Sequence, residues 1–89
     1  MKQEIFNNLK KVLENHYELS SDKDCERIQM TTNLKHEFCA DSFDLCSIMV
    51  MLEDEYNVCL TGEDSVEIME NATVENIVNV FYRVINKEK

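Results

Sequence analysis

The sequence predicts an all-α fold, a small four-helix bundle with a long first loop and a short third helix. Glycine occurs once and proline not at all, whereas all-β folds need such turn residues at short intervals. Apolar side chains also recur at helical spacing in several segments of the chain. A length of 89 residues allows one modest core, so we expect residues 1–89 to form a single domain.

The first helix is predicted over residues 2–17, where apolar residues fall on one face. That face comprises Ile5, Leu9, Val12 and His16. The connection that follows, residues 18–41, lacks sustained periodicity and has turn-forming serines and aspartates at 20–24. Leu34 and Phe38 are four positions apart and predict a single helical turn within it. A connection this long in so small a domain indicates a functional loop, pinned to the bundle by its apolar residues.

The second helix is predicted over residues 42–56. Asp41 is a suitable N-cap, and Asp44 stands where an acid can complete a capping box. The expected core stripe is Leu45, Ile48, Met49, Leu52 and Tyr56, and it is widened by Phe43, Cys46 and Val50. The helix is therefore apolar around more of its circumference than one buried stripe needs.

Two further helices complete the predicted bundle. A short helix over about 63–69 would start at a cap formed by Thr61 or Gly62. Thr73 would cap a last helix that runs to about residue 86. The buried face of that last helix is predicted to contain Val74, Ile77, Val78, Phe81, Val84 and Ile85.

The charge of the chain is strongly negative, with 9 Lys and Arg against 18 Asp and Glu. No Lys or Arg occurs between Lys35 and Arg83, a stretch that contains eleven acids. Such a surface argues against nucleic acid and anionic membranes as ligands, and favours proteins with basic patches. The acids Glu53, Asp54 and Glu55 end a predicted helix, where negative charge opposes the macrodipole. We therefore expect these three acids to have a binding role.

The cysteines stand at positions 25, 39, 46 and 59, without the short spacing of a zinc site. We expect no metal centre, and we expect reduced thiols that are mostly small buried side chains. The N-terminus has no apolar signal segment, and no apolar run reaches the length of a membrane span. These features predict a cytoplasmic protein, which we expect to be a monomer.

The segment from Leu34 to Asp44 reads Leu-Lys-His-Glu-Phe-Cys-Ala-Asp-Ser-Phe-Asp. It resembles the signature of acyl carrier proteins, in which Gly-Ala-Asp-Ser-Leu and an acid follow an apolar loop residue, an acid and a second apolar residue. Residues 45–56 are similar to the second helix of that family, and residues 71–77 are similar to its turn into the fourth helix. The resemblance thus covers nearly the whole chain.

Four positions depart from the family pattern. Cys39 replaces the glycine before alanine, and Phe43 replaces the leucine after serine. Ser47 stands where fatty-acid carriers commonly have an acid, and Thr61 where a proline is frequent. These departures bear on the pathway more than on the modification.

The resemblance implies that Ser42 carries 4'-phosphopantetheine, attached covalently from coenzyme A. The thiol of this arm would hold acyl intermediates of fatty acid, polyketide or related synthesis as thioesters, so the chain would be a carrier without catalytic residues. Its partners would be a phosphopantetheinyl transferase and the loading, synthase and transferase enzymes with basic patches. The surface that these enzymes read would comprise Asp41, Phe43, Asp44, Met51, Glu53, Asp54 and Glu55.

Two alternatives to an acyl carrier remain at this point. An aminoacyl or peptidyl carrier would use the same arm on Ser42, and Phe43 and Ser47 are compatible with it. An unmodified acidic helical module could instead bind a basic partner through the same acids. From the residues alone, without the resemblance, Ser42 reads as a serine that caps the N-terminus of a helix.

Overall fold

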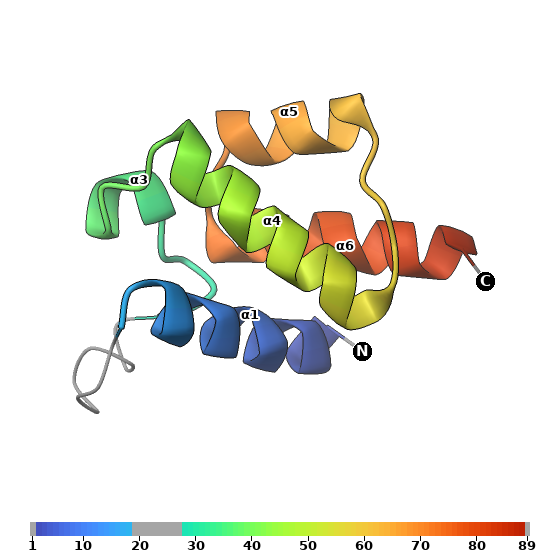
Figure 1. The fold of residues 1–89 in the computed structure, drawn as a ribbon, viewed down its shortest axis with the longest axis horizontal. Helices are drawn as coiled ribbons and strands as arrows, with labels where there is room; N and C mark the ends of the chain where they lie inside the picture. Colours follow the sequence, from blue (N-terminus) through green and yellow to red (C-terminus); the bar gives the residue numbers. More distant parts are fainter. Residues whose placement is uncertain (1, 19–27, 89) are drawn as a thin grey trace.

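The computed structural model describes residues 2–18 and 28–88, and all the regular elements in these ranges are helices (Figure 1). The helices are α1 (Lys2–His16), α3 (Leu34–Glu37), α4 (Ser42–Tyr56), α5 (Gly62–Glu70) and α6 (Val74–Glu88). The predicted four-helix bundle is confirmed, and its short third helix is α5. The label α3 belongs to the single helical turn that was expected within the long loop. The turn predicted at 20–24 lies outside the described residues, as does Cys25.

The core lies between α1, α4, α5 and α6, and each helix contributes side chains that solvent does not reach. Most of the predicted core residues are confirmed, since the exposed fractions of Leu45, Ile48, Met49, Leu52, Ile77 and Phe81 are 0–4%, whereas Tyr56 is only half-buried. In α1 the buried residues are Ile5, Leu9 and Leu13, and Val12 is only half-buried. Burial of one large apolar side chain stabilises a fold by about 1.5–3 kcal/mol. This core therefore contributes far more than any single polar contact.

The side chains expected to widen the buried stripe of α4 do not do so. Phe43 is 83% exposed and Val50 is 54% exposed, and Cys46 is exposed as well. The reason is geometric: α1 and α5 pack against α4, and the face that carries these three residues is turned away from the core. The expectation of buried thiols is also wrong for Cys39 and Cys59, which are exposed.

The end of the long loop is hydrogen-bonded to the N-terminus of α6. The backbone N–H groups of Val74 and Glu75 donate to the carbonyls of Thr32 and Met30, each at 2.9 Å. The hydroxyl of Thr73 accepts from the N–H of Asn76 at 3.2 Å, which confirms Thr73 as the cap. Most of the N–H groups that a helix start leaves unpaired are thereby satisfied. The predicted pinning of the loop is confirmed, and Ile28 and Leu34 add buried contacts.

Polar contacts hold α5 at both of its ends. Thr61 and Asp64 form a capping box at its start, which confirms Thr61 as the cap. The Arg83 guanidinium of α6 donates to the carboxylates of Asp64 at 2.7 Å and Glu67 at 2.8 Å. At the other end, the amide of Asn76 donates to the carbonyls of Glu67 and Asn71. These contacts compensate for a short helix whose only fully buried residue is Ile68.

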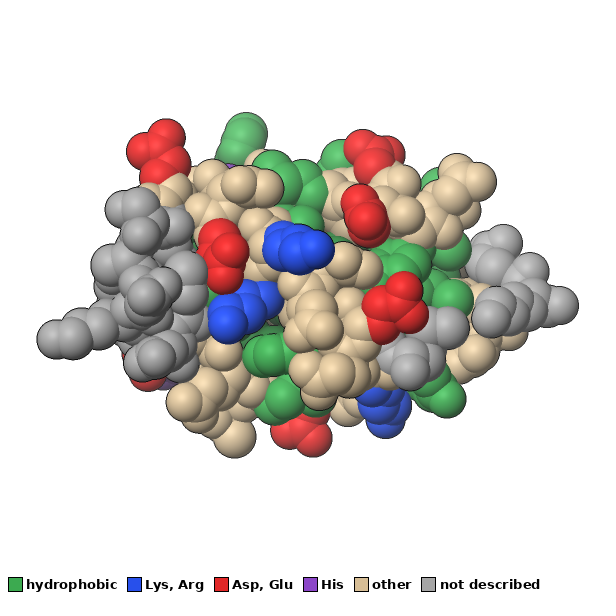
Figure 2. All heavy atoms as spheres, turned by 90° about the horizontal axis from the view of Figure 1, so that it is seen from below, with side chains coloured by type: hydrophobic (Ala, Val, Ile, Leu, Met, Phe, Trp, Pro, Cys, Tyr) green, Lys and Arg blue, Asp and Glu red, His purple; other side chains and the backbone are tan. Residues whose placement is uncertain are grey.

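The surface charge is mixed on the side of the molecule that includes α1. Figure 2 views this side, and it shows Lys and Arg side chains interspersed with Asp and Glu. The segment between Lys35 and Arg83 does not have such mixed charge. It contains eleven acids, most of them exposed, and no Lys or Arg. Within residues 2–18 and 28–88, Arg83 pairs with Asp64 and Glu67.

We expect added salt to raise the melting temperature of this protein. Salt screens repulsion between exposed acids over about 8–10 Å at 0.1–0.15 M ionic strength, and divalent cations should act more strongly per mole. Calorimetry from low to moderate NaCl concentration measures the effect. As a matched control, Glu55→Gln with Glu70→Gln should melt higher at low salt and respond less to added salt. A melting temperature that stays flat or falls would contradict the repulsion.

Candidate functional site

The first turn of α4 is closed by Asp41 and Asp44, as the sequence predicted. Asp41 is extended, and its Oδ1 accepts from the N–H of Asp44 at 2.9 Å. The Oδ2 of Asp44 accepts in return from the N–H of Asp41 at 3.3 Å. This capping box leaves Ser42 as the first helical residue, so the reading of Ser42 as the cap itself is wrong. The exposed Ser42 hydroxyl makes no hydrogen bond to any residue that the structure describes.

A left-handed residue between α3 and α4 turns the chain toward this site. Cys39 has a φ of 54°, and the N–H of Ala40 donates back to the carbonyl of Leu34 at 3.1 Å. Ala40 is buried and anchors the turn. The side chains of the next residues, Asp41 and Ser42, then reach solvent. A left-handed conformation costs a residue other than glycine about 1–2 kcal/mol, so Cys39 stores strain in the turn that presents Ser42.

The Asp44 carboxylate is also bound to α1. The Nε2 atom of His16 lies 3.0 Å from the Oδ1 of Asp44. The hydrogen bond from His16 is the largest cause that lowers the pKa of Asp44, followed by the one from the Asp41 backbone. Because the folded pKa is lowered, this stabilisation is present above the unfolded pKa and is lost as the pH falls through the folded one.

Aromatic side chains fill the space beneath the turn. Tyr17 stacks on Phe38 with ring centroids 5.0 Å apart, and it meets the His16 ring edge-on at 4.9 Å. Burial, followed by the charges of Asp44 and Asp41, raises the pKa of Tyr17 to about 12. The phenol is therefore neutral at physiological pH. Its hydroxyl is buried without a hydrogen-bond partner among the described residues.

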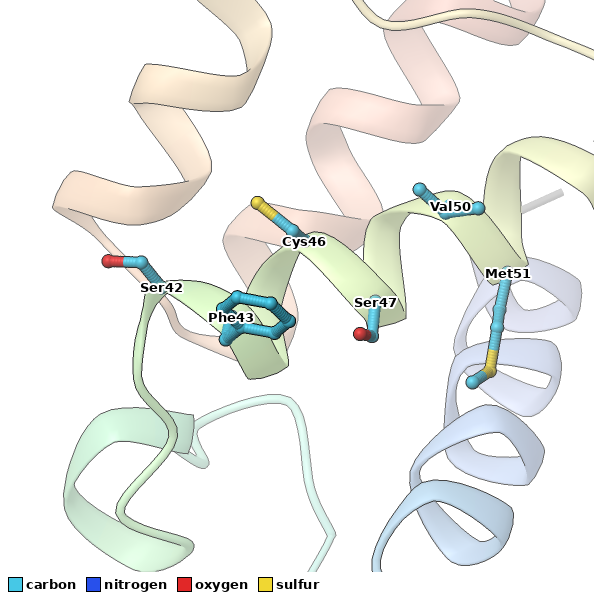
Figure 3. A pocket seen from close by; sticks show the side chains of 6 residues that line it. All are labelled: Ser42, Phe43, Cys46, Ser47, Val50 and Met51. Carbon is cyan, nitrogen blue, oxygen red and sulfur yellow. The ribbon is translucent and has the colours of Figure 1, made fainter.

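A groove of about 550 Å³ starts at Ser42 and follows the outer face of α4 (Figure 3). Its lining is mostly apolar and comprises Ser42, Phe43, Cys46, Ser47, Val50 and Met51. These residues form two rows with the four-residue spacing of neighbours on a helix. The structure thus brings the predicted residues Phe43 and Met51 together with Ser42, and it adds Cys46 and Val50, which the sequence assigned to the core.

The acids at the other end of α4 have different roles. The Glu53 carboxylate accepts from the N–H of Leu60 at 2.9 Å, and its carbonyl accepts from the N–H of Val58 at 3.1 Å. Glu53 therefore closes the loop between α4 and α5, so a binding role is not needed to explain it. Asp54 and Glu55 are exposed, and their binding role stays a prediction. They lie about 12 residues after Ser42, a distance of roughly 18 Å along a helix.

His16 is the residue of this site that sequence reasoning missed. Its partner lies 28 positions away, and no local spacing connects the two residues.

Within the ranges 2–18 and 28–88, no group of three His, Cys, Asp or Glu side chains is placed to hold a metal ion. In the same ranges, no helix is both long and apolar enough to cross a bilayer.

Replacing Cys39 by glycine should stabilise the fold. The change removes left-handed strain of about 1–2 kcal/mol and adds unfolded-state entropy of about 0.5–1 kcal/mol, so the free energy of unfolding should rise by about 0.5–1 kcal/mol. Urea denaturation measures it. Cys59→Gly is the matched control, since Cys59 is also exposed but has no positive φ, and it should lower stability. A less stable Cys39→Gly variant would refute the strain.

Comparisons with known proteins bear on this site. No protein-family model matches the chain. Among curated proteins, the chain is similar to the acyl carrier protein of Lactobacillus acidophilus, with 30% identity over 66 residues. The matched region covers 74% of this chain and 78% of that relative. The similarity therefore extends over most of both proteins, and this chain belongs to the acyl carrier protein family.

Proposed function

We propose that this chain is an acyl carrier and that the Ser42 hydroxyl holds 4'-phosphopantetheine. The main support is that Ser42 is exposed at the first position of α4. Asp41 caps the helix, so the Ser42 hydroxyl is not needed as the cap. A hydroxyl without an internal partner can be esterified without breaking a contact of the fold. The chain acts as a carrier and not as an enzyme, and the thiol of the bound arm supplies the thioester chemistry.

The surroundings of Ser42 fit a phosphate ester. The first turn of a helix has backbone N–H groups without intrahelical partners, and the macrodipole there favours negative charge. The nearest carboxylates already accept hydrogen bonds, Asp41 from the N–H of Asp44 and Asp44 from His16. The groove that starts at Ser42 leaves room beside the attachment point.

The outer face of α4 would be the surface that partner enzymes contact. Phe43 is 83% exposed, and exposed aromatic residues often dominate binding energy once a partner covers them. Asp41 and Asp44 lie at one end of the groove, and Asp54 and Glu55 follow its other end. An apolar centre with a charged rim is the usual anatomy of a protein interface. Partners would thus have an apolar contact for Phe43 and basic groups around it, as expected of phosphopantetheinyl transferases and loading enzymes.

The cargo that fits best is an acyl chain of the fatty acid or polyketide kind. The groove beside Ser42 is lined by Phe43, Cys46, Val50 and Met51, and these side chains favour apolar groups. An aminoacyl cargo would bring an ammonium group to this apolar lining, where desolvation disfavours a charge. The unmodified interaction module would use the same face without the arm, and the mass of the protein distinguishes it from a carrier.

Ser42→Ala should abolish attachment of the arm and leave the fold intact. The wild type, incubated with coenzyme A and a phosphopantetheinyl transferase, should gain the mass of one phosphopantetheine. Ser42→Ala should gain none, and its free energy of unfolding should change by less than about 1 kcal/mol because the hydroxyl is exposed. Ser65→Ala on α5 is the matched control and should be modified as the wild type is. Intact-mass spectrometry decides, and a modified Ser42→Ala would disprove the assignment.

Reversing the charge of Asp54 and Glu55 should slow arm attachment at low salt. The double variant Asp54→Lys with Glu55→Lys weakens electrostatic attraction to a basic partner, and salt should shrink its difference from the wild type. Its stability should not fall, because cations are favourable at a helix C-terminus. Glu53 is left unchanged because it holds the loop at Leu60.

The neutral pair Asp54→Asn with Glu55→Gln provides a graded control for this experiment. Its attachment rate at low salt should lie between those of the wild type and the lysine variant. Initial rates at two salt concentrations are the measurement. Equal rates for all three proteins at low salt would mean that these two acids do not guide the partner.

A further inference from the structure

Two polar side-chain contacts join α1 to α4, one near each end of α4. Near its C-terminus, the Asn8 amide donates to the Tyr56 hydroxyl at 2.5 Å. Near its N-terminus, the His16 ring meets the Asp44 carboxylate at 3.0 Å. Asp44, one member of this second contact, is two positions after Ser42, the residue that would be modified. Its place in the fold therefore suggests a role beyond holding the helices together.

The contact continues through the capping box to the residue that precedes Ser42. The Oδ1 of Asp44 accepts a hydrogen bond from His16, and its Oδ2 accepts one from the N–H of Asp41. The Oδ1 of Asp41 in turn accepts a hydrogen bond from the N–H of Asp44. If His16 is removed, the contact left to the Asp44 carboxylate among the described residues is the one with the Asp41 N–H, at 3.3 Å. His16 is thus the group that fixes the direction of this carboxylate from outside α4.

The His16 ring is itself held in place. It is 19% exposed and packs edge-on against Tyr17, whose ring stacks on Phe38 at the end of α3. Among the described residues, the titratable groups near the pair include the Asp41 carboxylate, the neutral phenol of Tyr17 and the Cys39 thiol. An imidazole whose proton is on Nε2 can donate to the Asp44 carboxylate whether the ring is neutral or charged.

We propose that His16 is a positioning residue for the modification of Ser42. By holding Asp44, it keeps the acidic first turn of α4 in the orientation that the modifying enzyme binds. This inference rests on the proposed function of Ser42. It also implies that a partner would meet the Asp44 carboxylate in one fixed orientation, because His16 binds it. Asp54 and Glu55 are exposed instead.

The test compares the kcat/KM of arm attachment among variants of His16. His16→Gln keeps a donor at about the place of Nε2 and should stay within about twofold of the wild type, whereas His16→Leu should lose roughly three- to tenfold, the worth of one hydrogen bond. His36→Leu is the matched control, because His36 is an exposed histidine on α3, and its rate should match the wild type.

A double-mutant cycle shows whether His16 acts through Asp44. In an Asp44→Ala background, the further change His16→Leu should have little effect, because the carboxylate that it orients is gone. An equal loss in both backgrounds would overturn the proposal, since His16 would then act through general stability. Equal rates for His16→Leu and the wild type would overturn it as well.

A measurement on the unmutated protein covers the case in which His16→Leu does not fold. In a carboxyl-detected NMR titration, the Asp44 midpoint should lie below the usual range of an aspartate, because the hydrogen bond from His16 lowers its pKa. An Asp44 midpoint within the usual range would overturn the proposal. The outcomes are separable: a wild type that takes no arm refutes the proposed function, whereas a wild type and His16→Leu that take it equally fast refute only the role of His16.

Discussion

An 89-residue bundle has too few helices to cover all the apolar side chains of α4, and this constraint shapes both its core and its candidate site. One face of α4 is fully buried, with Leu45, Ile48 and Leu52 at 0–1% exposure. The other face leaves Phe43 and Val50 more than half exposed. An apolar face of this kind promotes association unless a partner covers it. The numerous acids nearby oppose self-association through like-charge repulsion.

The placement of Ser42 depends on contacts that lie outside α4. The loop before α3 is fixed on α6 by the hydrogen bonds of Thr32 and Met30. The left-handed Cys39 and buried Ala40 then turn the chain into the capping box of α4. His16 binds the same box from α1. The exposed serine thus stands on a turn that three other helices hold, so partner binding need not first order this part of the chain.

The sequence predicted the helices well because their start signals are local. Asp41, Thr61 and Thr73 each cap a helix as expected, since a capping side chain reaches a backbone group only two or three residues away. It predicted the buried stripe of α4 but not where that stripe ends, because periodicity does not show how much of a broadly apolar helix its neighbours cover. For the same reason, Cys46 was assigned to the core. The pairing of His16 with Asp44 depends on how two helices pack, and no local pattern encodes it.

The acids of this protein divide into two groups by what they contact. Asp44 and Glu53 accept hydrogen bonds inside the fold, from His16 and from the Leu60 N–H, and they fix the two ends of α4. Asp54 and Glu55 are exposed, so their charge is available to an approaching partner. Asp44 and Glu53 stabilise the fold through these contacts, whereas Asp54 and Glu55 would act on a basic partner through long-range attraction that salt screens. The net charge of −9 therefore does not measure the charge that a partner would meet, because some of these acids also accept hydrogen bonds within the fold.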